Sequence, residues 1–275
     1  MRVVLTGASG FIGSRLYTFL KKQLVTDEVV GVSRGKAANS GYVILDSYEA
    51  CPSGDLLIHS AENSNLGQVE GMGEAYLIGQ REIAKSLASK FPRVIYLSSS
   101  VLYGNITDDR LTENTAIQQD SWYQKTKRTV EETFMSSTDA AILRLSNIYG
   151  GDFKRGTVIH DIAKQLDAAE IQLRVLNAKR DFLHVDDLSQ LILKIINSFR
   201  PGVFNVGYGE SYSAEELAGF FLKCQEGSKK VNGERIEGVS NVVINNTKIC
   251  DTFNWTPRIT IENGILGMLK LDCEI

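Results

Sequence analysis

The feature that most constrains this chain is a run of three glycines close to its start. Gly7, Gly10 and Gly13 directly follow the apolar stretch Val3 to Leu5 and precede an amphipathic pattern. A strand that turns through such a loop into a helix is suited to hold a pyrophosphate. The first glycine allows a tight turn. The second has no side chain, so the backbone can approach the phosphate closely, and the third lets the helix and the strand pack closely. The amides that open the helix attract the anion.

The spacing of this run is G-x-x-G-x-x-G rather than the G-x-G-x-x-G of larger dehydrogenases. Its context therefore carries the interpretation, because a strand precedes it and a helix follows it. A glycine turn at the surface between two elements is the alternative interpretation. We predict that the run binds a dinucleotide through the following residues: Gly7, Gly10, Phe11, Ile12 and Gly13.

Length and charge exclude several classes of protein. A chain of 275 residues, 43% of them hydrophobic, can bury a large core, and we expect two lobes. The net charge of -3, without a run of lysine and arginine, gives no electrostatic case for nucleic acid. No apolar stretch approaches the roughly 20 residues that span a bilayer, and the first strand begins too early to leave room for a signal peptide. We therefore expect a cytoplasmic protein that binds neither nucleic acid nor a membrane.

Metal binding is not expected from the cysteines and histidines. Cys51, Cys224, Cys250 and Cys273 are scattered without C-x-x-C spacing. This pattern favours reduced thiols over a disulfide framework or a zinc site. The chain contains 3 histidines, which argues against a histidine-based centre. We predict that the protein holds no metal.

Strands and helices alternate over the first half of the sequence. We expect short apolar strands at 29–32, 43–45, 56–59, 94–97 and 142–145, and helices at 14–22, 76–90 and 122–135. This alternation is typical of an α/β fold with a doubly wound parallel sheet, the Rossmann arrangement. The gap between the strands at 43–45 and 56–59 is too short for a full helix, so we expect a shortened crossover there.

The pattern becomes irregular beyond Gly150. Helices are expected at 158–168, 185–199 and 214–223, and a flexible loop at 226–241. We predict a dinucleotide-binding domain over residues 1–150, completed by part of 181–206. The remaining residues, 151–275, are predicted to form a smaller C-terminal lobe that binds the substrate.

Tyr123 and Lys127 lie four residues apart on a predicted helix and therefore share one face. A phenol can transfer a proton, but its pKa near 10 must fall by roughly 3 to give a base at neutral pH. One ammonium typically lowers such a pKa by about 1 to 3, so a second positive charge is needed. An oxidised nicotinamide ring supplies that charge. Tyr17 and Lys21 have the same spacing, for which a solvated helix face is the simpler interpretation.

A serine cluster distinguishes the two pairs. Ser98, Ser99 and Ser100 end a predicted strand at the carboxyl edge of the sheet, upstream of Tyr123. A hydroxyl at that place can donate to a substrate oxygen while the tyrosine moves the proton. A polar strand exit without catalytic function is the alternative interpretation.

Five segments carry a family resemblance: TGASGFIG at 6–13, YLSSSVLYG at 96–104, YQKTK at 123–127, LRLSNIYGG at 143–151 and RDFLHVDDL at 180–188. Through these motifs in this order, the chain resembles the extended short-chain dehydrogenase/reductases, the NAD(P)-dependent epimerase/dehydratase family. Segments at 203–217 and 253–265 extend the resemblance toward the C-terminus. It implies an enzyme in which Tyr123 transfers the proton, Lys127 supports it and holds the cofactor ribose, and Ser99 polarises the reacting oxygen.

The resemblance also implies contacts with a nucleotide-diphosphate sugar. Asn147 matches an asparagine that touches the substrate, and Arg180 matches an arginine that pairs with the diphosphate, a bidentate task suited to guanidinium. Arg235 looks like a second such arginine. The alternatives are a turn cap for Asn147 and ordinary surface charges for the two arginines. Asp186 and Asp187 open a predicted helix, so we interpret them as helix stabilisers rather than catalytic carboxylates.

The end of the second strand bears on the choice of cofactor. Family members that prefer NAD carry an acidic residue there, whereas this chain has Ser33 followed by Arg34. A guanidinium favours a 2′-phosphate, so we predict NADP(H), with NAD(H) as the alternative. Arg15, on the predicted helix at 14–22 that precedes this strand, is a further candidate for this contact. Asp46 matches the family's adenine-contacting aspartate after the third strand.

Other departures from the family concern the substrate. Ser100 and Val101 stand where 4,6-dehydratases carry the Asp-Glu pair that eliminates water, which disfavours dehydration. After His59, the usual second alanine is replaced by Glu62. Tyr76 stands where many relatives have an asparagine. The motifs for the cofactor are thus intact, while the identity of the substrate stays undetermined.

The leading hypothesis is an NAD(P)-dependent oxidoreductase that moves hydride at a carbon of a nucleotide-diphosphate sugar, with C4 preferred, as a 4-ketoreductase. A nucleotide-sugar 4-epimerase is the alternative. An epimerase must keep its cofactor and turn the sugar over in the site, so the preference for NADP(H) and the short substrate lobe favour the reductase. A non-catalytic NAD(P)-binding regulator and a reductase of a non-nucleotide carbonyl also stay open. The resemblance implies a homodimer through the helices at 76–90 and 122–135.

Overall fold

The computed structural model describes residues 1–34, 41–104, 110–151, 157–225 and 229–272. The chain forms two compact units. Unit 1 comprises Met1–Gly104, Ala116–Leu145 and Ser189–Phe204, and unit 2 comprises Asn105–Thr115, Ser146–Leu188 and Asn205–Ile275. Within the described ranges, no helix has both the length and the apolar character required to cross a membrane.

Unit 1 is built on a seven-stranded sheet in the order β11-β7-β5-β4-β1-β2-β3. Its strands are β1 (Arg2–Thr6), β2 (Glu28–Ser33), β3 (Val43–Ile44), β4 (Leu56–His59), β5 (Arg93–Ser99), β7 (Asp139–Leu145) and β11 (Gly202–Val206). All pairs from β3 to β7 are parallel. The chain winds outward from β1 in both directions, so the predicted doubly wound α/β fold is confirmed.

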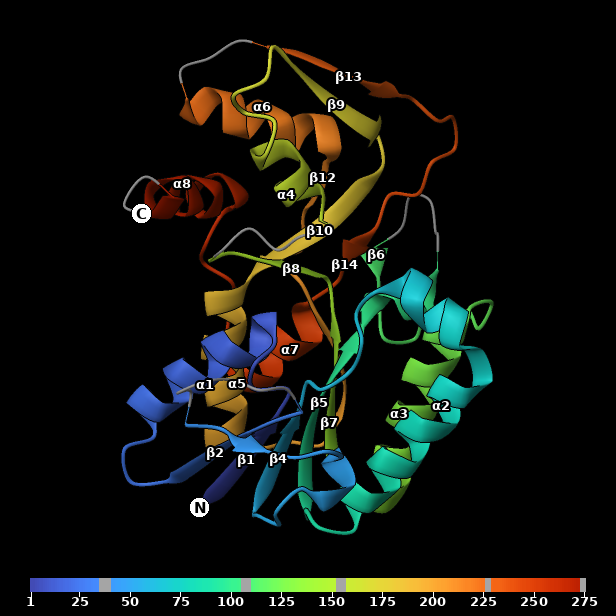
Figure 1. Cartoon of the computed structure of the whole chain (residues 1–275), viewed down its shortest axis with the longest axis vertical. Helices are drawn as coiled ribbons and strands as arrows, with labels where there is room; N and C mark the ends of the chain where they lie inside the picture. The colour runs from blue at the N-terminus through green and yellow to red at the C-terminus, as the bar shows by residue number, and fades with distance from the viewer. Residues whose placement is uncertain (35–40, 105–109, 152–156, 226–228, 273–275) are drawn as a thin grey trace. The chain divides into compact units, whose positions relative to one another are not determined.

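Helices cover both faces of this sheet (Figure 1). One face carries α2 (Leu66–Ala88) and α3 (Trp122–Ser137), which pack side by side, and the other carries α1 (Phe11–Gln23) and α5 (Val185–Asn197). Burial on both faces explains the continuous apolar strands, such as β4, which is buried along its whole length. The core beneath α2 and α3 includes Leu57, Tyr96, Ile142, Ile83, Leu87, Val130 and Phe134.

Two details of unit 1 bear on the predicted elements. The crossover between β3 and β4 contains the short 3-10 turn η1 (Tyr48–Ala50), in agreement with the shortened connection expected there. Helix α2 starts well before the predicted residue 76, because the chain stays helical through Gly71 and continues past Gly73. Gly73 has φ of 58° and ψ of -140° and interrupts the helix at that point. Glycines have low helix propensity, so the pattern did not predict a helix there.

The described residues of unit 2 form three small sheets. In the largest, β10 (Lys179–His184) pairs in parallel with β8 (Asn147–Tyr149) and antiparallel with β12 (Ser211–Ser213). The others pair β13 (Lys230–Glu234) with β9 (Glu170–Val175), and β14 (Val243–Ile244) with β6 (Arg110–Leu111). Its helices are α4 (Val158–Ala163), α6 (Ala214–Cys224), α7 (Thr247–Phe253) and α8 (Ile261–Asp272).

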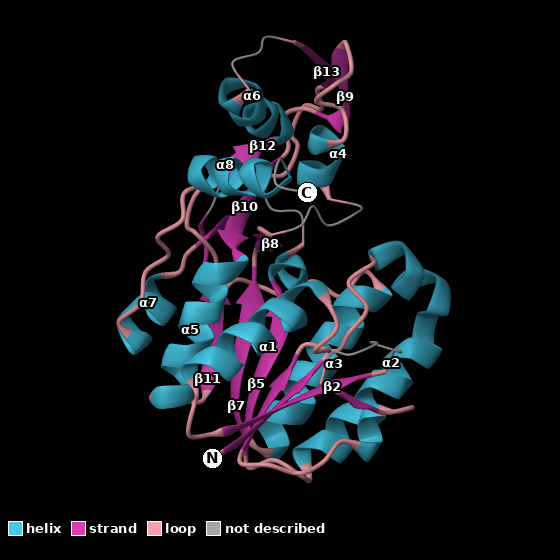
Figure 2. Ribbon diagram, turned by 60° about the vertical axis from the view of Figure 1, so that its left-hand side comes forward, coloured by secondary structure: helices cyan, strands magenta, loops and turns pink. Residues whose placement is uncertain are grey.

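The apolar core of unit 2 lies where α4, α6 and α8 gather beside β9, β10 and β12 (Figure 2). It includes Ile162, Ile171, Phe182, Leu217, Phe221 and Ile265. The predicted flexible loop at 226–241 is wrong in part, since β13 pairs with β9 within it; residues 226–228 lie outside the described ranges. Helix α4 also ends at Ala163, earlier than predicted. Pairing with distant β9 overrides the polar, glycine-containing sequence of β13.

Candidate active site

The glycine run forms a tight loop between β1 and α1. Gly7 has φ of 74°, and a Cβ there would lie 2.8 Å from the carbonyl oxygen of Ser60. A Cβ on Gly13 would lie 2.0 Å from the carbonyl oxygen of Gly7, so neither position accepts a side chain. Gly10 is the N-cap of α1 and makes no side-chain hydrogen bond, so this helix end, opened by Phe11 and Ile12, presents backbone. The cradle fits a dinucleotide pyrophosphate.

The end of β2 lies beside this loop. Ser33 is buried, and its Oγ is 2.5 Å from Oγ of Ser9 in the loop. Arg34 is exposed, and its guanidinium carbon lies 5.1 Å from the centre of the Tyr48 ring. Asp46 is exposed just after β3. The fold thus places the predicted cofactor residues Ser33 and Arg34 next to the glycine loop. The Arg34 guanidinium, which directly follows β2, is accessible to solvent.

Tyr123 and Lys127 occupy the first two turns of α3. A capping box between Ser121 and Gln124 begins this helix. The backbone N–H of Tyr123 also donates to Oε1 of Glu70 on α2, at 3.1 Å. Tyr123 is 8% exposed and Lys127 is 6% exposed, with Nζ 5.9 Å from the centre of the Tyr123 ring. The start of α3 is therefore held in place, and the two predicted side chains lie together.

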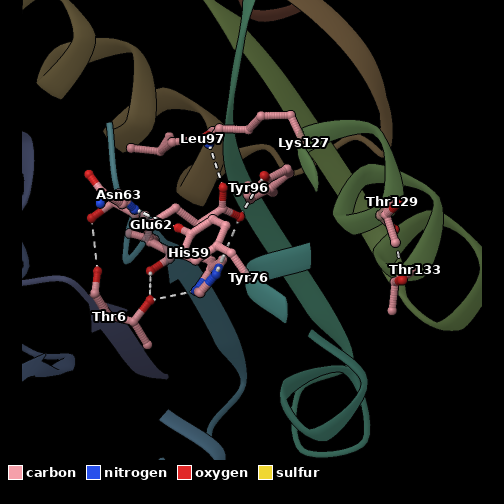
Figure 3. Close-up of polar contacts among 12 residues, drawn as sticks. Thr6, His59, Glu62, Asn63, Tyr76, Tyr96, Leu97, Lys127, Thr129 and Thr133 are labelled. Atoms are coloured by element: carbon pink, nitrogen blue, oxygen red, sulfur yellow. Dashed lines mark hydrogen bonds and ion pairs between the residues drawn. The ribbon is translucent and has the colours of Figure 1, made fainter. Parts of the chain in front are cut away.

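The Lys127 ammonium is surrounded by acceptors at the ends of β4 and β5 (Figure 3). Nζ donates to the carbonyl oxygen of Leu97 at 3.0 Å and lies 2.9 Å from Oε2 of Glu62. It also lies 5.0 Å from the centre of the Tyr96 ring. Burial lowers the pKa of Lys127, but the charge and hydrogen bond of Glu62, together with the phenols of Tyr123 and Tyr76, outweigh burial, so the pKa lies above its ordinary value. Lys127 is therefore an ammonium at neutral pH.

The adjacent serines of β5 have different partners. Oγ of Ser98 donates to Oε1 of Glu131 at 2.6 Å, and Glu131 forms a buried ion pair with Arg144 at 2.8 Å. Ser98 is therefore part of a structural network between β5, α3 and β7. Oγ of Ser99 accepts a hydrogen bond from the backbone N–H of Val101 at 3.2 Å. Because the Ser99 oxygen acts as acceptor there, its O–H can still donate to a ligand.

The predicted substrate residues of unit 2 lie on neighbouring strands. Asn147 is exposed at the start of β8, and its Nδ2 donates to the carbonyl oxygen of Asp181 at 3.2 Å. Arg180 on β10 is half-buried, and its Nη1 donates to the carbonyl oxygens of Lys179 and Ser240 at 2.7 and 3.0 Å. Burial lowers the pKa of Arg180, and no described carboxylate forms an ion pair with it. This cation is therefore suited to an anionic ligand.

Arg235 and Asp187 have other roles in unit 2. Nη2 of Arg235 lies 2.7 and 2.6 Å from the two carboxylate oxygens of Glu215, and the Arg235 side chain is 58% exposed. The structure thus pairs Arg235 at the surface instead of leaving its charge uncompensated. Oδ2 of Asp187 accepts the backbone N–H groups of Arg258 and Ile259 at 3.0 and 2.8 Å. Asp187 therefore anchors that loop in addition to opening α5.

A family model identifies the relatives of this chain. The model described as the NAD dependent epimerase/dehydratase family matches residues 3–207, which include the glycine loop, Ser99, Tyr123 and Lys127. The chain belongs to this family. It is an enzyme of the extended short-chain dehydrogenase/reductase type, as the motifs indicated.

Curated relatives of this epimerase/dehydratase family member act on several nucleotide sugars. It is 22% identical to the GDP-L-colitose synthase of Yersinia pseudotuberculosis, with 96% of each chain aligned. It is 24% identical to the UDP-glucose 4-epimerase of Halalkalibacterium halodurans over 79% of this chain and 78% of that protein. The match to the CDP-abequose synthase of Salmonella muenchen is 29% identical but spans 47% of this chain and 46% of that protein.

Solved structures of other family enzymes share the fold. The UDP-glucuronic acid 4-epimerase of Bacillus cereus, in complex with UDP-glucuronic acid and NAD, is 19% identical with a TM-score of 0.85 over 100% of this chain and 99% of that one. RMD from Pseudomonas aeruginosa, complexed with NADPH, is 20% identical with a TM-score of 0.82 over 100% and 99%. At these identities the likeness shows the fold.

Glu62 is a residue of this family member to which sequence reasoning assigned no role. Its side chain is 6% exposed, and Oε1 accepts the Tyr96 hydroxyl at 2.7 Å and lies 4.0 Å from Nε2 of His59. Figure 3 shows its carboxylate among Lys127, Tyr96 and His59. The available signal was a carboxylate immediately after a buried strand, where the family usually has alanine. The replacement of alanine by Glu62 was visible in the sequence, but its ion pair with Lys127 of α3 was not.

Proposed function

We propose that this enzyme is an NADPH-dependent 4-ketoreductase of a nucleoside-diphosphate sugar. The observation that carries the proposal is the buried pair of Tyr123 and Lys127, in which Lys127 donates to Leu97 near the carboxyl end of β5, the strand that ends at Ser99. A proton donor, an ammonium and a second hydroxyl are what reduction of a carbonyl to an alcohol requires. The names of the relatives, which include synthases and epimerases of GDP, CDP and UDP sugars, support the substrate class.

The residues of unit 1 fit a nicotinamide dinucleotide. A Cβ on Gly7 or Gly13 would clash with the protein backbone, and Gly10 places no side chain at the helix end where a pyrophosphate would lie. Phe11 and Ile12 would contribute helix amides, and Asp46 the adenine contact. When bound, the cofactor supplies the hydride that reaches the carbonyl carbon. Lys127 would hold a ribose hydroxyl with its ammonium.

Proton transfer is assigned to this chain's own side chains. Tyr123 donates its hydroxyl proton to the carbonyl oxygen as that oxygen gains negative charge. The Ser99 O–H donates a hydrogen bond to the same oxygen and stabilises the developing charge. The carbonyl carbon thus gains a hydride and the oxygen a proton, so the product is an alcohol. Tyr123 then recovers its proton from solvent.

The end of β2 supports the proposed preference for NADPH. An acidic residue that would accept ribose hydroxyls is replaced by Ser33, and the exposed cation of Arg34 follows it. A 2′-phosphate would gain a charge-assisted hydrogen bond from this guanidinium. In unit 2, we assign the nucleotide diphosphate to Arg180, whose charge lacks a described carboxylate partner, and a substrate contact to Asn147.

A 4-epimerase is the second candidate, because a family enzyme of that name aligns with most of this chain. The two functions differ in cofactor turnover. We expect a 4-keto sugar linked to UDP, GDP, CDP or dTDP to oxidise NADPH with one-to-one stoichiometry. The oxidation is measured as the loss of NADPH absorbance. Interconversion of two 4-hydroxy sugars without net NADPH oxidation would select the epimerase instead.

Replacing Tyr123 by Phe tests the catalytic assignment. The variant keeps the ring and loses the proton, so we expect kcat to fall by about 10²- to 10⁴-fold with the Kd of NADPH nearly unchanged. Tyr17→Phe is the matched control, because Tyr17 and Lys21 have the same spacing and, among the described residues, the Tyr17 hydroxyl donates to the carbonyl oxygen of Gly41. Full activity of Tyr123→Phe on the true substrate would eliminate the proposed role.

A further inference from the structure

A buried carboxylate faces the ammonium of the proposed proton-transfer pair. Glu62 follows β4, while Lys127 comes from α3, and their charged atoms lie 2.9 Å apart with both side chains at most 7% exposed. Oε1 of Glu62 also accepts the hydroxyl of the fully buried Tyr96 at 2.7 Å. Figure 3 shows Glu62 between Lys127 and Tyr96. The carboxylate is thus held in a definite orientation toward the ammonium.

The donors of Lys127 are divided among named acceptors. An ammonium has three N–H groups. One donates to the carbonyl oxygen of Leu97 and one to Glu62, from two different strand ends. Among the described residues, no third acceptor is found for Nζ, so one N–H stays available for a ribose hydroxyl. Glu62 therefore helps to determine where that donor points.

The charges of Lys127 and Glu62 compensate each other, and Glu70 of α2, which accepts the backbone N–H of Tyr123, is a further carboxylate beside Tyr123. The titratable groups that face Lys127 and Glu62 are His59 from β4, Tyr76 from α2, Tyr96 from β5 and Tyr123 from α3, with Glu131 facing Tyr96. Burial lowers the pKa of His59 to about 4, so that ring is neutral at pH 7. Burial raises the pKa of Tyr76 to about 12 and that of Tyr96 well above its usual range, so both stay phenols. Glu131 is compensated by Arg144.

We propose that Glu62 is a positioning residue that fixes the Lys127 ammonium and cancels its charge, so that Tyr123 stays protonated and the site is set for carbonyl reduction. This inference rests on the proposed role of Tyr123 as proton donor. An uncompensated ammonium would favour the phenolate, the form that takes a proton from an alcohol. Compensation by Glu62 favours the phenol, the form that gives a proton to a carbonyl.

Titration of Tyr123 in the protein without cofactor tests this inference apart from turnover. The ionisation of Tyr123 is read as the difference in phenolate absorbance between the wild type and Tyr123→Phe, and again between Glu62→Gln and the double variant. Glu62→Gln should move this ionisation down by about one pH unit or more, a tenfold change in the equilibrium. An unchanged midpoint would overturn the proposal.

Further variants separate charge from folding. Glu62→Asp keeps the charge but shortens the reach, so the Tyr123 midpoint should stay near the wild-type value while NADPH binds several-fold more weakly. Glu74→Gln, the same substitution on the exposed face of α2, should change neither property. A structural role alone would lower the Tm of Glu62→Gln without moving the Tyr123 midpoint.

Two outcomes keep the inference distinct from the proposed function. If Glu62→Gln does not fold, the wild-type titration decides, and ionisation of Tyr123 near pH 7 would overturn the inference. Failure of the proposed function shows elsewhere, as full activity of Tyr123→Phe or as absence of NADPH oxidation with every keto sugar. The absorbance titration requires neither substrate nor cofactor, so it reports on Glu62 in either case.

Discussion

Burial gives His59 a property that its residue type does not reveal. It is 1% exposed at the end of β4, and its Nδ1 lies 2.7 Å from Oγ1 of Thr6. Its ring packs against those of Tyr96 and Phe134, which also contact each other. Burial lowers its pKa to about 4, against which the charge of Glu62 acts in the opposite direction. The folded protein therefore keeps this imidazole neutral in a range where an unfolded chain protonates it.

This difference predicts a loss of stability in acid. Between pH 6.5 and about 4 the unfolded chain binds a proton at His59 that the folded chain does not, so the free energy of unfolding falls as pH falls. The loss amounts to at most about 3 kcal/mol. Urea denaturation at pH 7 and at pH 4 should show it in the wild type, and a smaller loss in His59→Asn.

The matched control is His160→Asn, which changes the half-buried histidine of α4. Its loss of stability between the two pH values is measured in the same way. Equal pH slopes for the wild type and His59→Asn would contradict the argument from burial. The comparison of slopes removes the contributions of other titrating groups, which all three proteins share.

The loop between β1 and α1 shows how one element constrains another. The predicted Cβ of Gly13→Ala would overlap the carbonyl oxygen of Gly7, so loop and helix must separate. We expect this substitution to destabilise the protein by about 1–3 kcal/mol and to weaken NADPH binding more than tenfold. Thermal unfolding and a direct binding titration measure the two effects.

Gly219→Ala is the matched control for that experiment. Gly219 lies on the exposed side of α6, and nothing is found within 4 Å of a Cβ built there. An alanine in this helix should therefore raise stability by about 0.5–1 kcal/mol and leave NADPH binding unchanged. Wild-type NADPH affinity in Gly13→Ala would show that the loop geometry does not determine binding.

Elements with a strong local pattern were predicted well. β4 and β5 were expected from apolar runs, and α3 begins at the predicted Trp122 because Ser121 and Gln124 form a capping box. Elements that depend on distant partners were not. β13 forms only by pairing with β9, and α2 extends through Gly73, where no local signal favours a helix. Local periodicity reports burial along one element, whereas pairing depends on the rest of the chain.

At the scale of the whole molecule, we propose that the enzyme forms the homodimer implied by its family. Large apolar side chains are exposed on both helices of the predicted interface, with Ile78 of α2 43% exposed and Met135 of α3 39% exposed. α2 and α3 pack side by side (Figure 1). Burial of such side chains against a second copy would remove apolar area from water.

Ile78→Asp tests this assembly. A carboxylate in an apolar interface is costly to desolvate, so we expect the variant to sediment as a monomer where the wild type sediments as a dimer. Val25→Asp is the control, since Val25 is 84% exposed between α1 and β2. A wild-type protein that sediments as a monomer at micromolar concentration would rule the dimer out.

The sequence by itself determined the features that lie close together along the chain. The glycine loop, the four-residue spacing of Tyr123 and Lys127 and the alternation of strands and helices are all local, so the doubly wound fold and the dinucleotide site could be predicted from them. Only the tertiary structure decided which side chains from distant parts of the chain contact one another. It pairs Glu62 with Lys127, commits Ser98 to Glu131 while Ser99 can still donate, and compensates Arg235 through Glu215. The physical reason is that charge compensation and hydrogen-bond satisfaction depend on distances in space, which spacing along a chain does not record.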